Sequence, residues 1–337
     1  MNVLVTGHSG YIGVHLVDLL KGSGHTVTGC DIGLFRGCEW RPSTAPDVEW
    51  VRDVRALTER DLEGFDAICH LAAISNDPMG DIDPSITLDI NRDASVRLAR
   101  LAKRAGVERF LFAGSCSVYG KTDTLDLDET AELNPLSAYA QSKIEAEREI
   151  APMADAGFCP VFLRNATAYG DSPMLRIDLV VNNLLGCALS KGEIRIMSDG
   201  SPWRPLVHCR DIARAFVALM EAPVDDVRGL AVNIGGNREN FQVRDVAAQV
   251  ERLVPGAGVT FTGEVGADPR DYRVNFDLLG RVLPDFQLAY TLESGMEELH
   301  RNMLAAGFSA DDFDGPRYVR LRTLRPRLEL LTGRKAA

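Results

Sequence analysis

Residues 1–24 decide the fold, and they read MNVLVTGHSGYIGVHLVDLLKGSG. The apolar run Val3–Val5 predicts a buried strand, and the apolar spacing over Tyr11–Lys21 predicts a helix. The junction between them holds three glycines, Gly7, Gly10 and Gly13. A GxxGxxG turn in this context lets the backbone approach a pyrophosphate, while the helix N-terminus adds a positive dipole. The stretch therefore predicts a dinucleotide-binding turn.

An acidic residue after the second strand supports this interpretation. Asp31 follows the apolar run His25–Cys30 and stands 24 residues after Gly7. This separation is close to the ~20 residues at which such folds place an acid on the ribose 2′-hydroxyl. Because a carboxylate there repels a 2′-phosphate, NAD is favoured over NADP. Arg36 lies near enough in sequence to keep NADP open.

Apolar runs alternate with helical patterns through the first half of the chain. Most of the runs indicate strands buried on both faces, and they lie at Val3–Val5, His25–Cys30, Val48–Val51, Ala67–Leu71, Arg109–Ala113 and Pro160–Leu163. The helical patterns lie at Tyr11–Lys21, Pro84–Ala105 and Ser137–Ala156. Such alternation forms a parallel sheet through right-handed crossovers. We therefore predict an α/β fold with a doubly wound parallel Rossmann sheet.

After about residue 170 the alternation loosens, which predicts a smaller, mixed α/β C-terminal domain. Its helical patterns lie at Leu175–Leu189, Asp211–Glu221, Val243–Leu253 and Leu292–Ala305. The expected parts are an NAD-binding domain over 1–172, to which the chain returns at about 206–236, a substrate domain over 173–205 and 237–310, and a basic tail over 311–337. The tail is expected to be solvated or to form a packing helix.

Composition limits the classes of partner. The net charge of -11 argues against nucleic acid or an anionic membrane as the main partner. The seven cysteines show no CxxC pairing, so neither a disulfide framework nor a metal site is expected. The N-terminus lacks a basic flank, and no apolar run reaches the ~18 residues of a membrane span. A cytoplasmic, unexported protein is the expectation.

A tyrosine and a lysine carry the candidate chemistry. Tyr139 and Lys143, in SAYAQSK, are four residues apart in a helical pattern and so project from one face. An ordinary phenol has a pKa near ~10, but a neighbouring ammonium favours the phenolate. Ser115 follows the run RFLFAG, where a parallel strand ends and such sheets bind ligands. Ser115 can then hydrogen-bond a substrate hydroxyl.

Seven motifs occur in a familiar order between residue 1 and about residue 300. They are TGxxGxxG at Thr6–Gly13, HLAA at His70–Ala73, Asn91 in DINRDAS, SCSVYG at Ser115–Gly120, YxxxK, RNATAYG at Arg164–Gly170 and RPLVHCRDIARAF at Arg204–Phe216. With them the chain resembles the extended short-chain dehydrogenases/reductases, and among these the nucleotide-sugar epimerases and dehydratases. The resemblance implies bound NAD and an NDP-sugar held between two domains.

The resemblance also implies roles for individual residues. Catalysis falls to Ser115, Tyr139 and Lys143. The cofactor is expected to contact Gly7, Ser9, Gly10, Tyr11, Ile12, Gly13, Asp31, Asp53, Val54, Leu71, Ala72, Ala73, Asn91, Tyr139 and Lys143. The NDP-sugar is expected to contact Ser75, Ser117, Asn165, Asn183, Arg204, Arg270 and Arg273, although DPRDYRVNFD departs from the usual spacing and leaves the roles of the last two arginines open. His70 and His208 are expected to be structural.

One position departs from the dehydratase pattern. Where the 4,6-dehydratases of this family carry an Asp and a Glu, this chain has Cys116 and Ser117. A serine hydroxyl does not ionise near neutral pH, whereas a thiol with a pKa near ~8.5 can exchange a proton. Cys116 is therefore either a catalytic acid and base or a small packing residue.

These observations favour an NDP-sugar 4-epimerase that acts through a transient 4-keto sugar. A dehydratase that uses Cys116 and an NDP-4-ketosugar reductase stay open as alternatives. A non-catalytic NAD(H)-sensing protein is disfavoured because Ser115, Tyr139 and Lys143 are all present. The resemblance further suggests a homodimer, while no nucleic-acid-binding motif occurs.

Overall fold

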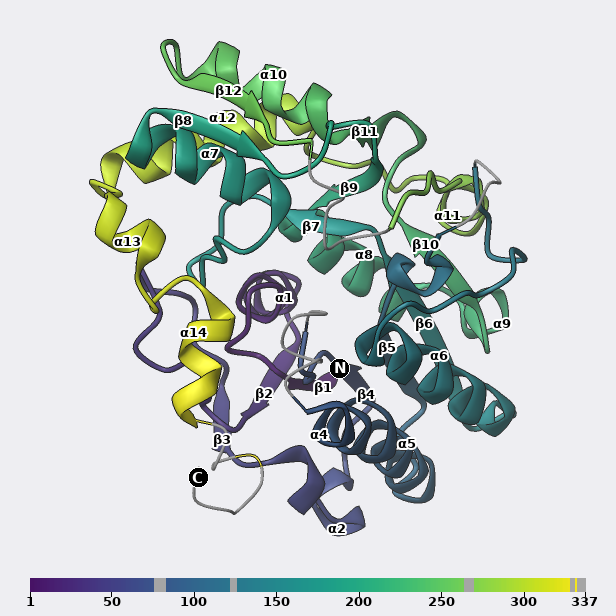
Figure 1. Cartoon of the computed structure of the whole chain (residues 1–337). Coiled ribbons are helices and arrows are strands. Elements are labelled where there is room, and N and C mark those ends of the chain that lie inside the picture. The colour runs from purple at the N-terminus through teal and green to yellow at the C-terminus, as the bar shows by residue number, and fades with distance from the viewer. Residues whose placement is uncertain (76–82, 122–125, 264–269, 328–330, 332–337) are drawn as a thin grey trace.

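A seven-stranded parallel sheet forms the centre of the molecule (Figure 1). The computed structural model describes residues 1–75, 83–121, 126–263, 270–327 and 331. The strands, in the spatial order β10-β6-β5-β4-β1-β2-β3, are β1 (Asn2–Thr6), β2 (Thr26–Asp31), β3 (Val48–Val51), β4 (Ala67–His70), β5 (Arg109–Ser115), β6 (Cys159–Asn165) and β10 (Ala231–Ile234). This arrangement confirms the predicted doubly wound α/β fold.

Helices cover both faces of this sheet and bury a separate apolar core on each (Figure 1). They are α1 (Gly13–Gly22), α2 (Glu59–Leu62), α4 (Pro84–Leu88), α5 (Ala94–Arg104), α6 (Ala138–Ile150), α8 (Cys209–Glu221), α9 (Val224–Val227) and α11 (Asp277–Val282). On one face, Leu16 of α1 and Phe216 of α8 pack with Val3 and Val5. On the other face, Leu4 packs in a cluster that includes residues of α5 and α6. Alternate residues of one strand thus serve opposite cores.

The edge strand β3 differs from the prediction of burial on both faces. Val48 and Val51 are 48% and 53% exposed. β3 is the last strand of the sheet and pairs with β2 alone, so one of its sides has no neighbouring strand to cover it. The strand itself forms where the sequence predicted it.

The strand order reverses at β1, which places the first turn at the functional edge of the sheet. Thr6 lies opposite Cys30 of β2 and opposite His70 of β4. The segments that follow these three strands therefore emerge side by side. In open α/β sheets this switch point, outside the carboxyl ends of the strands, is where ligands bind.

The second half of the chain adds two small sheets. One has the order β11-β9-β7 and the other pairs β12 with β8. Their elements are β7 (Thr167–Tyr169), β8 (Glu193–Ile196), β9 (Trp203–His208), β11 (Asn240–Gln242), β12 (Gly258–Phe261), α7 (Val180–Lys191), α10 (Val243–Leu253) and α12 (Leu292–Ala305). β10 then returns to the large sheet beside β6. The proposed domain boundaries stay a prediction.

One expected helix begins later than the sequence pattern indicated. The pattern predicted a helix from Leu175, but α7 starts at Val180. Side chains hold the residues before it outside a helix: Asn182 donates to the Arg176 carbonyl, and Asn183 donates to the Ile177 carbonyl. Apolar residues such as Leu175 and Ile177 are nevertheless buried, which explains why their spacing extended the pattern.

The C-terminal segment packs on the molecule. It contains α13 (Ala310–Asp314) and α14 (Arg320–Leu324), and Leu324 is fully buried. The described part of the tail thus packs on the molecule, while its assignment as a separate part of the chain stays a prediction. Across the described part of the chain, the helices are too short or too polar to cross a bilayer.

Candidate active site

The glycine turn after β1 forms a cradle that side chains would fill. A Cβ atom on Gly13 would lie 2.2 Å from the carbonyl oxygen of Gly7. One on Gly7, which has φ of 71°, would lie 2.8 Å from the backbone nitrogen of Ala72. The turn thus packs backbone against backbone and has no room for a side chain at Gly7 or Gly13. This geometry fits the dinucleotide diphosphate that the sequence predicted.

We expect Gly13→Ala to weaken NAD binding by about 10-fold to 100-fold, a loss of ~1.4–2.8 kcal/mol of binding free energy, because a Cβ 2.2 Å from the Gly7 carbonyl oxygen forces the backbone of the cradle to move. Gly22→Ala is the matched control, since a Cβ there meets nothing within 4 Å and Gly22 lies in the same helix. Isothermal titration with NAD and a thermal melt of each variant measure the two effects. Equal NAD affinity in the two variants would contradict the assignment of the cradle.

Asp31, the acid expected to bind the ribose, and Asp53, another expected cofactor contact, lie at or just after the ends of neighbouring strands of the sheet. Asp31 ends β2, and its Oδ1 accepts the backbone N–H of Gly33 at 2.7 Å. Asp53 caps a short 3-10 turn and is bound by the Arg55 guanidinium at 2.6 Å. Arg36, which kept NADP open, forms an ion pair of 3.0 Å with Glu49 and is more than half exposed. That pairing reduces its availability for a 2′-phosphate.

Asn91 acts from behind this edge. It lies in a π-helical turn, Asp89–Asp93, between α4 and α5, and is fully buried. Its side chain accepts the N–H of Ile74 at 2.8 Å and donates to the Ile74 carbonyl at 2.9 Å. Asn91 therefore holds the segment after β4, which includes Ala72 and Ala73, and is a positioning residue.

The predicted catalytic residues come from β5 and α6. Ser115 ends β5, and its Oγ accepts the backbone N–H of Ser117 at 3.2 Å. Tyr139 and Lys143 lie in α6, with the Lys143 Nζ 5.8 Å from the centre of the Tyr139 ring and 4.7 Å from that of Phe112. Burial lowers the pKa of Lys143 to about 7. The amine is thus poised to exchange a proton near neutral pH.

Cys116 turns away from this chemistry. Its side chain is fully buried, and its Sγ donates to the Arg164 carbonyl at 3.1 Å and lies 3.8 Å from Oδ1 of Asn233. Burial raises the pKa of the thiol. These contacts support packing rather than proton transfer to a sugar.

Two buried polar atoms near Ser115 have no hydrogen-bond partner within the described residues. Asn165 lies opposite Ser115 in the sheet and donates to the Gly114 carbonyl, but its Oδ1 is buried with no hydrogen bond among the described residues. The Ser117 Oγ is likewise buried and unpaired within the described ranges. Buried polar atoms normally have partners, so these two are suited to substrate hydroxyl groups.

Four of the residues expected to contact the NDP-sugar lie in the second half of the chain. Asn183 lies in the first turn of α7, and its side-chain amide donates to the Ile177 carbonyl. Arg204 on β9 donates to the carbonyl of Arg270 at 2.5 Å. The Arg273 guanidinium lies 5.0 Å from the Trp203 ring centre. The three arginines thus gather at one end of β9, and the division of roles between Arg270 and Arg273 stays open.

Both histidines that were expected to be structural are buried among partners. His70 bridges Thr6 at 2.6 Å and Ser95 at 2.8 Å, and burial lowers its pKa to about 3, so it is neutral. His208 stacks on Tyr290 with ring centres 3.8 Å apart. These contacts account for both residues without a proton-transfer role.

Sequence reasoning missed a polar cluster before α7. The side chain of Arg176 pairs with Asp178 at 2.6 Å and donates to Ser75 at 3.2 Å. Asn182 accepts the Gly170 N–H and donates to the Arg176 carbonyl. A lone arginine within an expected helix resembles a surface residue, so no sequence signal marked this cluster. It connects Ser75, a predicted substrate residue, to the segment after β7.

The Tyr11 hydroxyl serves the same junction. It donates to the Gly170 carbonyl at 2.6 Å and also receives a bond from Asn182. Its hydroxyl is therefore engaged between the glycine turn and the segment after β7. Any contact of Tyr11 with a cofactor would involve other atoms.

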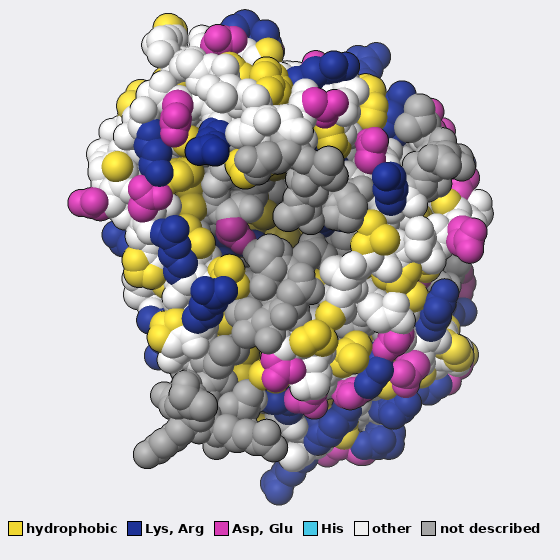
Figure 2. All heavy atoms as spheres, viewed as in Figure 1, with side chains coloured by type: hydrophobic (Ala, Val, Ile, Leu, Met, Phe, Trp, Pro, Cys, Tyr) yellow, Lys and Arg dark blue, Asp and Glu magenta, His cyan; other side chains and the backbone are white. Residues whose placement is uncertain are grey.

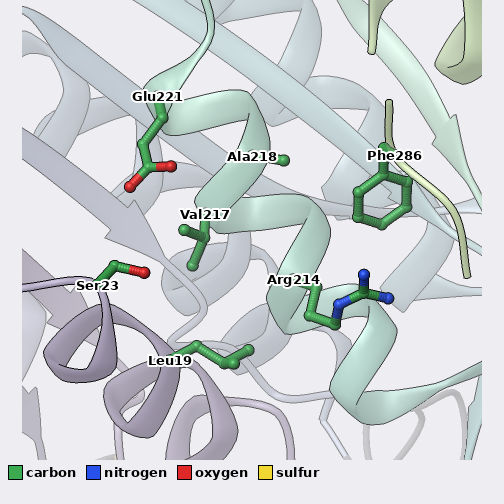
Figure 3. A pocket seen from close by; sticks show the side chains of 7 residues that line it. All are labelled: Leu19, Ser23, Arg214, Val217, Ala218, Glu221 and Phe286. Atoms are coloured by element: carbon green, nitrogen blue, oxygen red, sulfur yellow. The ribbon is translucent and has the colours of Figure 1, made fainter. Parts of the chain in front are cut away.

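Two surface features complete the description. Figure 2 shows a hollow near the centre of the face viewed, with apolar side chains at its floor. A separate groove lies between α1 and α8 and is lined by Leu19, Ser23, Arg214, Val217, Ala218, Glu221 and Phe286 (Figure 3). Leu19 and Ser23 lie at the C-terminal end of α1, whereas the glycine turn precedes its N-terminus. The groove is therefore remote from the candidate site.

Comparisons with known proteins agree with this architecture. Residues 3–235 match the model of the NAD dependent epimerase/dehydratase family. The uncharacterized UDP-glucose epimerase YtcB of Bacillus subtilis (strain 168) is 30% identical over 284 residues, which cover 80% of this chain and 87% of YtcB.

Two solved structures are also similar. TunA, described as an NAD-dependent NDP-hexosamine 5,6-dehydratase of tunicamycin biosynthesis, has a TM-score of 0.81 and 27% identity, covering 90% of this chain and 98% of TunA. MoeE5 in complex with UDP-glucuronic acid and NAD has a TM-score of 0.79 and 28% identity, covering 91% of this chain and 100% of MoeE5.

Proposed function

The chain belongs to the NAD dependent epimerase/dehydratase family, and from this premise we propose that it is an NDP-sugar 4-epimerase. It is an enzyme of the NAD-dependent nucleotide-sugar class, and the proposal concerns the reaction within that class. The observation that carries it is the placement of the residues after Ser115. Cys116 faces the core and Ser117 replaces a carboxylate, so neither offers a base for a second carbon.

Residues at the carboxyl edge of the sheet would hold NAD. The glycine cradle receives the diphosphate, and Asp31 receives the adenosine ribose. When bound, NAD supplies a hydride acceptor that makes the interconversion of alcohol and ketone at C4 possible. The cradle fits because a Cβ on Gly7 or Gly13 would collide with backbone atoms.

Tyr139 removes the proton of the C4 hydroxyl and later returns it. A phenol suits both steps when a neighbouring cation lowers the cost of the phenolate. Lys143 provides that cation from the same face of α6. Ser115 at the end of β5 orients the hydroxyl by hydrogen bonding. Between the two proton transfers the 4-keto sugar rotates in the site, so that the opposite face of C4 is presented for the return of the hydride.

Epimerisation needs no acid or base at C5 or C6, which matches this residue set. The unpaired Ser117 Oγ and Asn165 Oδ1 are available to hold the sugar ring. Arg204 is the proposed ligand of the nucleotide diphosphate, since a guanidinium fork matches phosphate oxygens. We propose a uridine nucleotide because MoeE5 was solved with UDP-glucuronic acid and with UDP-glucose.

A panel of nucleotide sugars tests the reaction. The purified protein is incubated with NAD and with UDP-glucose, UDP-GlcNAc, UDP-glucuronic acid and a dTDP-sugar, and the products are analysed by NMR and mass spectrometry. We expect one substrate to give its C4 epimer with unchanged mass. Retention of every substrate by a protein that binds NAD would count against the proposal.

Dehydration is the second candidate, because TunA is described as a dehydratase. It would give a product lighter by one water. An NDP-4-ketosugar reductase would instead consume reduced cofactor and add two hydrogens. The same mass measurement therefore separates the three reactions.

Substitutions at neighbouring positions distinguish the roles of Cys116 and Ser117. We expect Ser117→Ala to raise KM by about 2-fold to 10-fold, since a neutral hydrogen bond contributes ~0.5–1.5 kcal/mol. We expect Cys116→Ala to retain at least about one third of kcat, because its thiol faces Arg164 and Asn233 in the core. Steady-state kinetics measure both. A loss of about 100-fold in kcat for Cys116→Ala, with unchanged melting temperature, would restore the thiol as acid and base.

We also propose that the enzyme is a homodimer that pairs through α5 and α6. These helices lie side by side on one face of the sheet (Figure 1). Long helices of this kind can form a four-helix bundle between two subunits. Sedimentation equilibrium is expected to give twice the mass of one chain, and a single-chain mass would refute this assembly.

A further inference from the structure

The C-terminal segment reaches the NAD-binding half of the molecule. Residues of α14 pack with residues that follow β2. Leu324 and Leu331 pack with Leu34, which follows β2, and with Ile74, which follows β4. Backbone contacts add to this packing: Arg327 donates to the Leu34 carbonyl at 2.5 Å. The segment therefore covers loops that follow two strands of the cofactor edge.

Arg320 is the buried cation of this segment. Its side chain is 2% exposed, and its Nη2 donates to the Met174 carbonyl at 3.0 Å. The guanidinium carbon lies 4.3 Å from the ring centre of Phe35. Nη1 is buried and has no hydrogen-bond partner within the described residues. One edge of the fork is thus left for a ligand.

The charged groups around Arg320 do not fully balance its positive charge. Arg176 and Arg320 are both buried near Asp178, and the Asp178 carboxylate already forms two hydrogen bonds with Arg176. Asp178 and Glu39 favour the charged form of Arg320, but less than burial and the repulsion of Arg176 oppose it. Burial and the repulsion of Arg176 lower the pKa of Arg320 to about 10, so it is charged at neutral pH. A buried charge without a full set of partners is costly, and a bound anion would offset that cost.

The position of Arg320 indicates which anion. Phe35 and Met174, which flank its guanidinium, pack with Val14 in the first turn of α1. Thr323, on the same helix as Arg320, contacts Cys38 in this cluster at 3.8 Å. The first turn of α1 follows the glycine cradle and is where a dinucleotide diphosphate binds. Arg320 is therefore connected, through Phe35 and Met174, to the first turn of α1.

We propose that Arg320 is a further cofactor-binding residue whose Nη1 binds the diphosphate of NAD. α14 thereby completes the NAD site from the far end of the chain. The inference depends on NAD binding, which belongs to the family, and is independent of whether the enzyme is a 4-epimerase. Binding assays without any sugar can therefore test it.

Three variants make the test specific. Arg320→Met removes the charge and keeps apolar bulk against Phe35. Arg320→Lys keeps the charge without the fork. Arg322→Met is the matched control, because Arg322 is an exposed arginine on the same helix. Isothermal titration with NAD, ADP-ribose, adenosine and UDP, together with melting curves of the apo proteins, provides the readouts.

A charge-assisted hydrogen bond of ~1.5–3 kcal/mol corresponds to about 10-fold to 100-fold in affinity. We expect Arg320→Met to weaken NAD and ADP-ribose by this factor and to leave adenosine and UDP unchanged, whereas Arg320→Lys recovers part of the loss. The melting temperature of apo Arg320→Met should not fall, because an incompletely paired buried cation has been removed.

Three outcomes would overturn the proposal. One is equal NAD affinity in Arg320→Met and Arg322→Met. Another is a loss confined to UDP, which would assign Arg320 to the sugar nucleotide. The third is a lower melting temperature of apo Arg320→Met together with native NAD affinity, measured both for Arg320→Lys and for the folded fraction of Arg320→Met. That result would make the residue structural. Failure to epimerise any sugar would leave these binding results unaffected.

Discussion

Tyr139→Phe is expected to lower kcat by about 10³-fold while NAD binding changes little. The substitution removes one hydroxyl and preserves the ring that lies 5.8 Å from the Lys143 Nζ. General acid–base catalysis contributes ~10²–10⁴-fold, and no other described residue is proposed to take the C4 proton. Product formation from the preferred UDP-sugar gives kcat, and titration with NAD gives the cofactor affinity.

Tyr290→Phe provides the matched control for this experiment. Tyr290 stacks on His208, and the phenyl ring would keep that contact. We expect its kcat to remain within about threefold of the native value. If Tyr139→Phe also retained more than about one tenth of kcat, the proton would have to be transferred by another group, and the proposed mechanism would be wrong.

Lys143→Met is expected to lower kcat/KM by about 10²-fold at pH 7 and to change the shape of the pH profile. Lys143 is 4% exposed, and burial lowers its pKa to about 7. Methionine keeps the apolar stem against Phe112 but removes the charge. The phenol then loses the cation that favours its ionised form.

The direction of the pH effect follows from the proton count of the pair. Below about pH 7 the phenol and the amine are both protonated, and the pair cannot accept the proton of the substrate. As pH rises through about 7 the pair loses one proton and becomes active, so kcat/KM should increase to a plateau. This midpoint follows the pKa of Lys143, which burial lowers to about 7.

In Lys143→Met the active form requires ionisation of a phenol alone, for which the ordinary pKa is ~10. We therefore expect the rising limb of the profile to move at least one unit to higher pH, with partial recovery of activity in alkaline buffer. Lys191→Met, which removes a partly exposed amine paired with Asp314, is the control and should keep the native profile. An unchanged midpoint in Lys143→Met would exclude Lys143 as the partner of Tyr139.

Much of the fold was predictable because the signals were local and periodic. The six predicted strands of the first half all form. Continuous apolar runs are typical of strands in a parallel sheet that is covered on both faces. The edge position of β3 was not predictable, because the exposure of Val48 and Val51 depends on strand order. The late start of α7 was missed for a similar reason: Asn182 and Asn183 bind backbone carbonyls that a sequence pattern does not show.

The candidate site shows the same division. The spacing of Tyr139 and Lys143 on one helix predicted their shared face, and the structure places them together. Whether the Cys116 thiol faced the sugar or the core could not be decided from its position after Ser115. The contacts with Arg164 and Asn233 come from strands that are distant in sequence.

By itself the sequence determined the parallel sheet, the glycine turn and the helical tyrosine–lysine pair, because each depends on backbone geometry repeated over neighbouring residues. Only the tertiary structure decided that the thiol of Cys116 is turned inward and that the C-terminal Arg320 contacts Phe35, which packs with Val14 of α1. These facts depend on packing between segments far apart in the chain. The free energies of burial, charge pairing and lost hydrogen bonds to water at these residues depend on the neighbours that the folded chain places around them.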